Sequence, residues 1–167
     1  PAQLACCQPN HRWATGLDEE VREERDENKE RMLHLLIQKI ENRKSKPSVR
    51  FHFEEGMSYE EKYELVSKWW NDFRFHLSMA VKSPAELNRF LGNSLSSETM
   101  YLLNRARKKG MPFFATPYYL SLLDITGKAY DDEAIRSYIL YSPQLVETYG
   151  NIRAWEKEDV VEAGKPN

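Results

Sequence analysis

The sequence predicts an all-α, mainly helical fold, and three observations support this prediction. Apolar residues recur at helical spacing along much of the chain. Serine or threonine precedes several of these stretches, where its side-chain oxygen can cap a helix. Glycine follows several of them, where helices commonly end. The length of 167 residues then indicates one helical domain with extensions.

The composition excludes several classes of function. Hydrophobic residues make up 41% of the chain and charged residues 30%, which allows a real core beneath a charged surface. The net charge of −2 provides no overall attraction to nucleic acids or anionic membranes. No apolar run approaches the ~20 residues that cross a bilayer, and no secretory signal is recognisable. We therefore expect a cytoplasmic protein without nucleic-acid or membrane partners.

Residues 1–16 are expected to form a disordered or extended N-terminus. Cys6 and Cys7 are neighbours, and a disulfide between adjacent residues has poor geometry. Together with His11 they would supply only part of a four-ligand zinc site, and no second Cys/His cluster exists. We expect two free thiols in a frayed terminus and no metal ligands.

Residues 17–46 are predicted to form one long amphipathic helix. Its first half is almost entirely charged and is expected to be solvated, stabilised by pairs such as Glu27 with Arg31. Its second half is strongly apolar from Met32 to Ile40 and must be buried. Residues 47–57 are expected to be a linker or a short extended arm, and the alternation from Val49 to Phe53 also allows a short strand.

Residues 58–149 are predicted to form a helical domain. Ser58 and Glu61 fit a capping box at its first helix. Apolar residues at steps of three and four then predict one continuous helical face, with Trp70 towards the core and Trp69 beside it. The residues of this face are Tyr59, Tyr63, Val66, Trp70, Phe73, Leu77 and Ala80.

Shorter helices are expected to follow. One begins at Ser83-Pro84 and ends at Gly92, and the next runs from a serine start to Gly110. The least polar stretch is FFATPYYLSLLD, in which Thr116 should cap a short helix that begins at Pro117. This helix is apolar nearly all round, which is typical of a buried helix.

The last predicted helix begins at Asp131 and is ended by Pro143. Residues 150–167 read as a polar tail.

No motif in the chain carries recognisable chemistry. It lacks a glycine-rich phosphate loop, a nucleophile elbow and the spacing of a His-Glu-x-x-His metal site. The histidines are scattered, and His34 and His76 are expected to pack within helices. The basic cluster from Arg105 to Gly110 fits a helix C-terminus better than a phosphate site. We therefore predict no catalytic, cofactor-binding or metal-binding residues in this chain.

Two segments, WWNDFRFHL and FFATPYYLSLLD, resemble the N-terminal region of the lysine 2,3-aminomutase family of radical S-adenosylmethionine enzymes. Beyond Asp124, only Ile135-Arg136 of the family's next segment is kept. The signature residues, which the resemblance implies serve in docking, are Trp70, Asn71, Asp72, Thr116, Pro117, Tyr118, Tyr119 and Asp124.

The resemblance implies a parent enzyme that cleaves S-adenosylmethionine reductively at a [4Fe–4S] cluster. The resulting radical would abstract hydrogen from an amino acid, with use of pyridoxal phosphate left open. The family's cluster cysteines and pyridoxal phosphate residues lie further along the chain, in a catalytic barrel towards which residues 150–167 would lead. None of them can be assigned to this chain, whose partners would be that downstream barrel and further copies in a homo-oligomer.

Two functions are therefore compared. The first is an N-terminal helical assembly and docking segment of an aminomutase-like enzyme, inactive in isolation. The alternative is a self-contained helical interaction module that binds a partner through the face from Tyr59 to Ala80.

Overall fold

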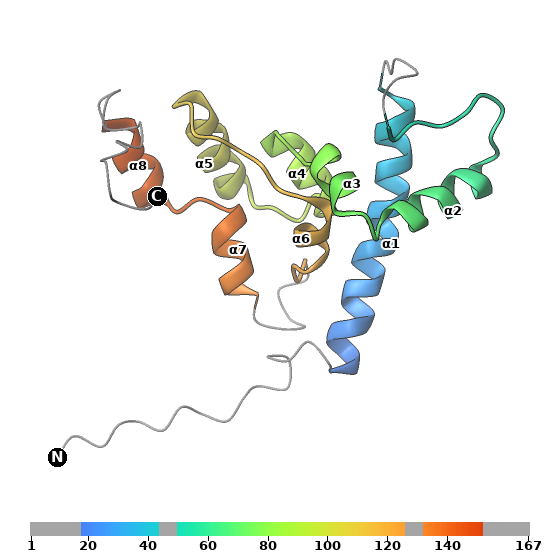
Figure 1. The fold of residues 1–167 in the computed structure, drawn as a ribbon. Helices are drawn as coiled ribbons and strands as arrows, with labels where there is room; N and C mark the ends of the chain where they lie inside the picture. Colours follow the sequence, from blue (N-terminus) through green and yellow to red (C-terminus); the bar gives the residue numbers. More distant parts are fainter. Residues whose placement is uncertain (1–17, 44–49, 126–131, 152–167) are drawn as a thin grey trace, which may run out of the picture.

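Eight helices make up the part of the chain described by the computed structural model, which covers residues 18–43, 50–125 and 132–151 (Figure 1). The all-α prediction is confirmed. Across these ranges, β-type pairing is confined to an isolated antiparallel bridge between Val81 and Ala115. The helices are α1 (Glu19–Glu41), α2 (Tyr59–Trp69), α3 (Phe73–Ser78), α4 (Pro84–Phe90), α5 (Ser97–Lys108), α6 (Pro117–Ser121), α7 (Glu133–Ile139) and α8 (Pro143–Asn151).

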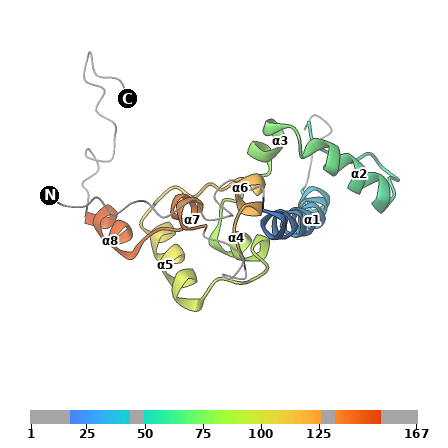
Figure 2. The ribbon, with the colours of Figure 1, turned by 90° about the horizontal axis from the view of Figure 1, so that it is seen from below.

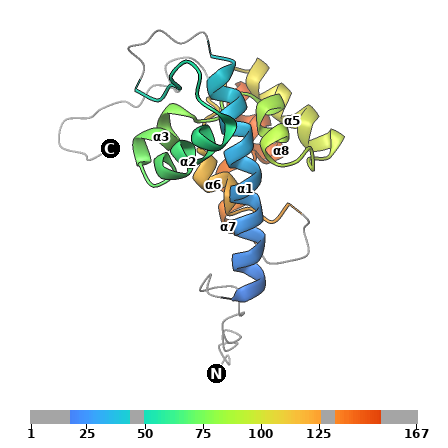
Figure 3. The same ribbon diagram turned by 90° about the vertical axis from the view of Figure 1, so that its right-hand side faces the viewer.

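The helices form a row, with α1 and α2 at one end and α8 at the other (Figures 1 and 2). Figure 3 views the row from the end where α1 and α2 lie. The long helix α1 packs against α2, α4 and α6, while α5 packs against α4 and α8. The main core lies where α1 meets the shorter helices, and it joins Leu36 of α1 to Phe75, Leu87 and Leu120.

Helix α1 begins at the Asp18 cap, whose side chain accepts a hydrogen bond from the backbone N–H of Glu20 (3.1 Å). Its apolar half is buried from Met32 to Ile40, as the sequence predicts. Its charged half is not simply solvated, because Asn28 has no exposed surface. This side chain faces α6, and a buried amide needs hydrogen-bond partners, which α6 supplies.

The prediction of one continuous face from Tyr59 to Ala80 is wrong. Helix α2 ends at Trp69, and Asp72 caps a new helix by accepting from the backbone N–H of Arg74 (2.9 Å). An aspartate that bonds the backbone in this way competes with helix continuation. The change of direction leaves Trp70 buried but Phe73 67% exposed.

The predicted caps of the other helices are formed. Ser58 Oγ accepts from the backbone N–H of Glu61 (3.2 Å), and Glu61 accepts from that of Ser58 (2.7 Å), which completes the capping box. Ser83 caps α4, with Pro84 in the first helical position. Gly92 and Gly110 adopt φ angles of +64° and +80° just beyond α4 and α5, a conformation that favours glycine.

Other expectations differ from the structure or lie outside it. Residues 50–57 form neither helix nor strand, and Phe51 is buried in the main core. Pro143 does not end a helix, because α7 already ends at Ile139; it begins α8 instead, since proline suits a first helical turn. Helix α7 begins at Glu133, whereas Asp131 lies outside the described residues.

Most of the predicted terminal segments also lie outside the described residues. They include residues 1–16 with Cys6 and Cys7, and the tail from residue 152 onward. Within the described ranges, no helix has the length and apolar character needed to cross a membrane.

Candidate functional site

The short helix α6 is positioned by its own sequence. Thr116 Oγ1 accepts a hydrogen bond from the backbone N–H of Tyr119 (3.5 Å), and Pro117 occupies the first turn. The predicted cap at Thr116 is therefore confirmed. Because α6 spans only five residues, this start fixes the direction in which each of its side chains points.

The inner side of α6 is packed against α1. Leu120 and Leu123 are completely buried. Asn28 Nδ2 donates to the carbonyl oxygens of Ser121 (3.3 Å) and Leu123 (2.8 Å). Asn28 thus satisfies the carbonyl group of the last residue of α6 and that of Leu123, two residues beyond the helix.

The amide oxygen of Asn28 is also bonded. Arg31 donates to Asn28 Oδ1 (2.6 Å) and, more weakly, to the carbonyl oxygen of Phe90 (3.4 Å). This network joins α1, α4 and α6. It was missed in the sequence, where Asn28 stands within a run of charged residues that resembles a solvated face.

The outer side of α6 is exposed. Tyr118 and Tyr119 are 49% and 52% exposed, so the expectation of a helix buried all round is wrong. The two rings contact each other edge to face at 6.1 Å between centroids. A five-residue helix has little more than one turn, and α1 covers only one side of it.

Beneath Tyr118 lies the buried imidazole of His76. Its Nε2 donates to the carbonyl oxygen of Trp70 (2.6 Å), and its ring packs edge-on to Trp70 at 4.8 Å and to Tyr118 at 5.9 Å. Its Nδ1 is buried without a hydrogen-bond partner among the described residues. Burial lowers the pKa of His76 below its ordinary 6.5, against the opposing influence of the Trp70 carbonyl and Asp72.

Large apolar side chains gather on the surface around α6. They come from α3, from the segment before α6, from α6 itself and from α7, and about half or more of each is exposed. We call this surface the aromatic face, and it consists of Phe73, Leu77, Phe114, Tyr118, Tyr119 and Tyr138. A group of exposed aromatic residues of this kind is typical of an interaction surface.

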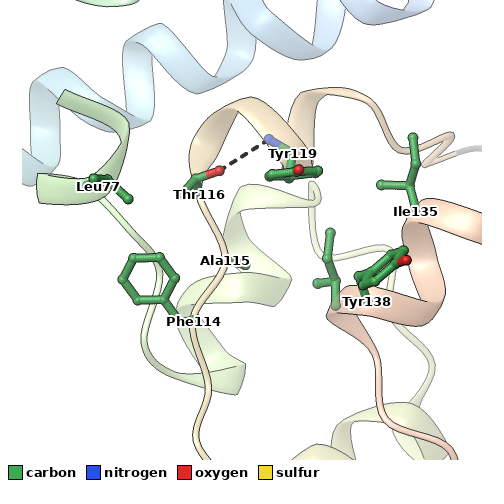
Figure 4. A pocket seen from close by; sticks show the side chains of 8 residues that line it. Leu77, Phe114, Ala115, Thr116, Tyr119, Ile135 and Tyr138 are labelled. Atoms are coloured by element: carbon green, nitrogen blue, oxygen red, sulfur yellow. Dashed lines mark hydrogen bonds between the residues drawn. The ribbon is translucent and has the colours of Figure 1, made fainter. Parts of the chain in front are cut away.

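Two adjoining pockets hollow the aromatic face. The α7 pocket, of about 590 Å³, has Leu77 and Phe114 on one side and Ile135 and Tyr138 on the other, with the Thr116–Tyr119 turn between them (Figure 4). The α3 pocket has a volume of about 440 Å³. Its lining residues are Trp70, Asn71, Phe73, His76, Leu77, Thr116, Tyr118 and Tyr119.

Most of the signature residues lie at this surface. Trp70, Asn71, Thr116, Tyr118 and Tyr119 line the α3 pocket. Among the others, Pro117 is the buried first residue of α6, and Asp72 caps α3 and forms an ion pair with Arg50 (3.1 Å).

Asp124 is separate from the aromatic face and almost completely buried. Its backbone N–H donates to Asp132 Oδ2 (2.8 Å), and its carbonyl oxygen accepts from Arg136 (2.7 Å). Arg136 also binds both carboxylate oxygens of Asp132, at 2.8 and 2.7 Å. This clamp joins the end of the α6 segment to α7.

The contribution of α7 to the surface was not found in the sequence. Ile135, Tyr138 and Ile139 form one wall of the α7 pocket. Their spacing of three and four residues was a usable signal, since it places all three on one side of a helix.

The pockets do not fit the cofactors implied by the resemblance. Neither lining contains lysine, arginine or cysteine, so a phosphate or carboxylate has no cationic partner and a cluster has no thiolates. Across the described ranges, no group of three or more His, Cys, Asp or Glu could hold a metal ion. In the basic cluster, Arg105 pairs with Glu147 (2.5 Å) and Lys109 donates to the carbonyl oxygen of Val146 (2.9 Å), both on α8.

Comparison with known proteins gives one weak similarity. The chain is 28% identical over 94 residues to an uncharacterised KamA family protein of Methanocaldococcus jannaschii. The match covers 53% of this chain but only 15% of that protein. No family model and no solved structure matches the chain.

Proposed function

We propose that this chain is the N-terminal helical segment of an aminomutase-like radical S-adenosylmethionine enzyme, and that its aromatic face docks on the catalytic part of that enzyme. The observation that carries the proposal is the position of the signature residues. Asn71, Thr116, Tyr118 and Tyr119 line the α3 pocket at an exposed apolar surface, whereas Trp70, which also lines this pocket, is buried in the core. A motif needed only for folding would be expected inside.

The partial similarity to a KamA family protein supports the same assignment. Because the matched region is 15% of that protein, most of such a polypeptide remains to provide a catalytic part. The [4Fe–4S] cluster and S-adenosylmethionine, which supply radical chemistry, would bind there, and so would pyridoxal phosphate if the enzyme uses it. The residues of this chain would take part in assembly, including assembly into a homo-oligomer.

A first test is the reading frame beyond Asn167. The proposal expects a Cys-x-x-x-Cys-x-x-Cys motif in the catalytic part. A stop codon directly after Asn167 would contradict it and would favour a self-contained interaction module.

A second test uses the isolated chain of 167 residues. Burial of one large apolar side chain is worth roughly 1.5–3 kcal/mol, so the uncovered rings should drive self-association or bind a hydrophobic dye. We expect dye fluorescence with the isolated chain that is suppressed in the longer polypeptide. The control is Tyr101→Ser, because Tyr101 is even more exposed than Tyr118 and Tyr119 but lies on α5, away from the aromatic face. A monomer that binds no dye would contradict docking.

A further inference from the structure

We infer that the aromatic face receives two separate apolar side chains from a segment of the catalytic part, one in the α7 pocket and one in the α3 pocket. This inference rests on the proposed function and specifies the chemistry of the partner. The two pockets share a wall made of Leu77, Thr116 and Tyr119. Their common wall makes them neighbouring parts of one groove.

The occupant of this groove is apolar. The lining of the α7 pocket consists of aliphatic and aromatic residues together with Thr116, whose hydroxyl oxygen already caps α6. The α3 pocket adds two neutral polar residues, Asn71 and His76; Nε2 of His76 donates to the Trp70 carbonyl, and its buried Nδ1 has no partner among the described residues. A carboxylate or phosphate would lose its hydration here without gaining a cationic partner.

The pockets accept two side chains because their outer walls come from different elements. The outer wall of the α3 pocket is formed by Trp70, Asn71 and Phe73, at the junction of α2 and α3. The outer wall of the α7 pocket is formed by Ile135 and Tyr138, which the Asp132–Arg136 clamp holds in place. Apolar anchors that enter separate pockets are the usual source of affinity at protein interfaces.

A segment of the same polypeptide is the occupant that best fits. The similar KamA family protein is much longer than the region it shares with this chain, so most of its length could supply such a segment. A segment in the same polypeptide is held at high effective concentration, so two anchors suffice without a large interface.

Covalent labelling of aromatic side chains, read by mass spectrometry, tests this inference. The labelling rates of Tyr138 in the α7 pocket and Phe73 in the α3 pocket are compared between the 167-residue chain and the longer polypeptide. Both side chains are more than half exposed in this structure. We expect several-fold protection of both in the longer polypeptide, while Tyr101 on α5 is labelled equally in the two.

The outcomes separate the inference from the proposed function. Protection of only one of the two residues would overturn the two-anchor inference and leave docking intact. Protection of neither would overturn both. As matched variants, Phe73→Ser and Tyr138→Ser are made singly in the longer polypeptide, and each should leave the other pocket protected. Loss of protection at Tyr138 in the Phe73→Ser variant, or at Phe73 in the Tyr138→Ser variant, would show that the pockets act as one, against the inference.

Discussion

Two buried polar side chains, Asn28 and His76, lie on different sides of α6. They differ in how many of their polar atoms have a hydrogen-bond partner. Asn28, on the side of α1, has partners for both its amide nitrogen and its amide oxygen. His76, beneath the aromatic face, has a partner for Nε2 but none for Nδ1 among the described residues. The interior is therefore fully hydrogen-bonded at Asn28 but not at His76.

The apolar residues of α6 show the same difference. Leu120 is covered by the core, whereas Tyr118 and Tyr119, its sequence neighbours, are half exposed. Their positions around a single helical turn place Leu120 on the covered side and the two tyrosines on the exposed side. Helix α6 therefore has one side that packs against α1 and another side on which both tyrosines are exposed.

The largest expected effect comes from a pair of substitutions that compares the core with the aromatic face. Trp70 is buried and Phe73, three residues later, is largely exposed. Trp70→Ala should lower the free energy of unfolding by about 3–5 kcal/mol, through lost burial and the cavity it leaves. Phe73→Ala should change it by no more than about 0.5 kcal/mol. Urea denaturation of the 167-residue chain measures both.

Equal denaturation midpoints for these two variants would contradict the separation of α2 from α3. Trp69→Ala provides a further check within the core. The Trp69 ring lies 5.4 Å from that of Phe51 and 5.6 Å from that of Phe75, so its loss should also be clearly destabilising.

A smaller effect is expected at the closed side of α6. Asn28→Ala leaves the carbonyl oxygens of Ser121 and Leu123 without this donor, and a buried unsatisfied group costs about 1–3 kcal/mol. The control is Asp26→Ala, which removes an exposed side chain from the same helix. Thermal unfolding of the two variants should separate them clearly. If Asn28→Ala were as stable as the control, the network between α1 and α6 would contribute nothing to stability.

The sequence predicted those features that depend on a few neighbouring residues. The all-α class, the apolar half of α1 and the caps at Ser58 and Thr116 follow from local chemistry, and the structure contains them. The residues of the α3 pocket were also within reach, because the resemblance named most of them.

Features that depend on tertiary packing were missed. The break between α2 and α3 was hidden because the apolar spacing of three and four continues through Asp72, which nevertheless caps a new helix. The burial of Asn28 required knowing that α6 packs there. Tyr138 was missed because only the fold brings α7 beside Phe114.

The last prediction concerns the response to pH of His76, which can be protonated, whereas the amide of Asn28 cannot. Burial places the pKa of His76 below its ordinary 6.5 in the folded chain. As the pH falls through about 6.5, His76 therefore binds a proton more readily in the unfolded state than in the folded state, and the stability of the folded chain falls. The charged imidazole would carry a second N–H at Nδ1, for which the described residues offer no acceptor.

The measurement compares urea midpoints of the unmodified chain and of His76→Phe, from above to below the ordinary histidine value of about 6.5. Groups that titrate in both proteins cancel in the difference. One of these groups is Glu24, whose pKa is raised mainly by burial and also by the charges of Asp124 and Glu27. Its contribution to stability therefore increases as the pH falls, opposite to that of His76. The unmodified chain should lose more stability on acidification than the variant, whose phenylalanine does not titrate. If the urea midpoints of the two proteins changed in parallel with pH, His76 would not be held neutral by its surroundings.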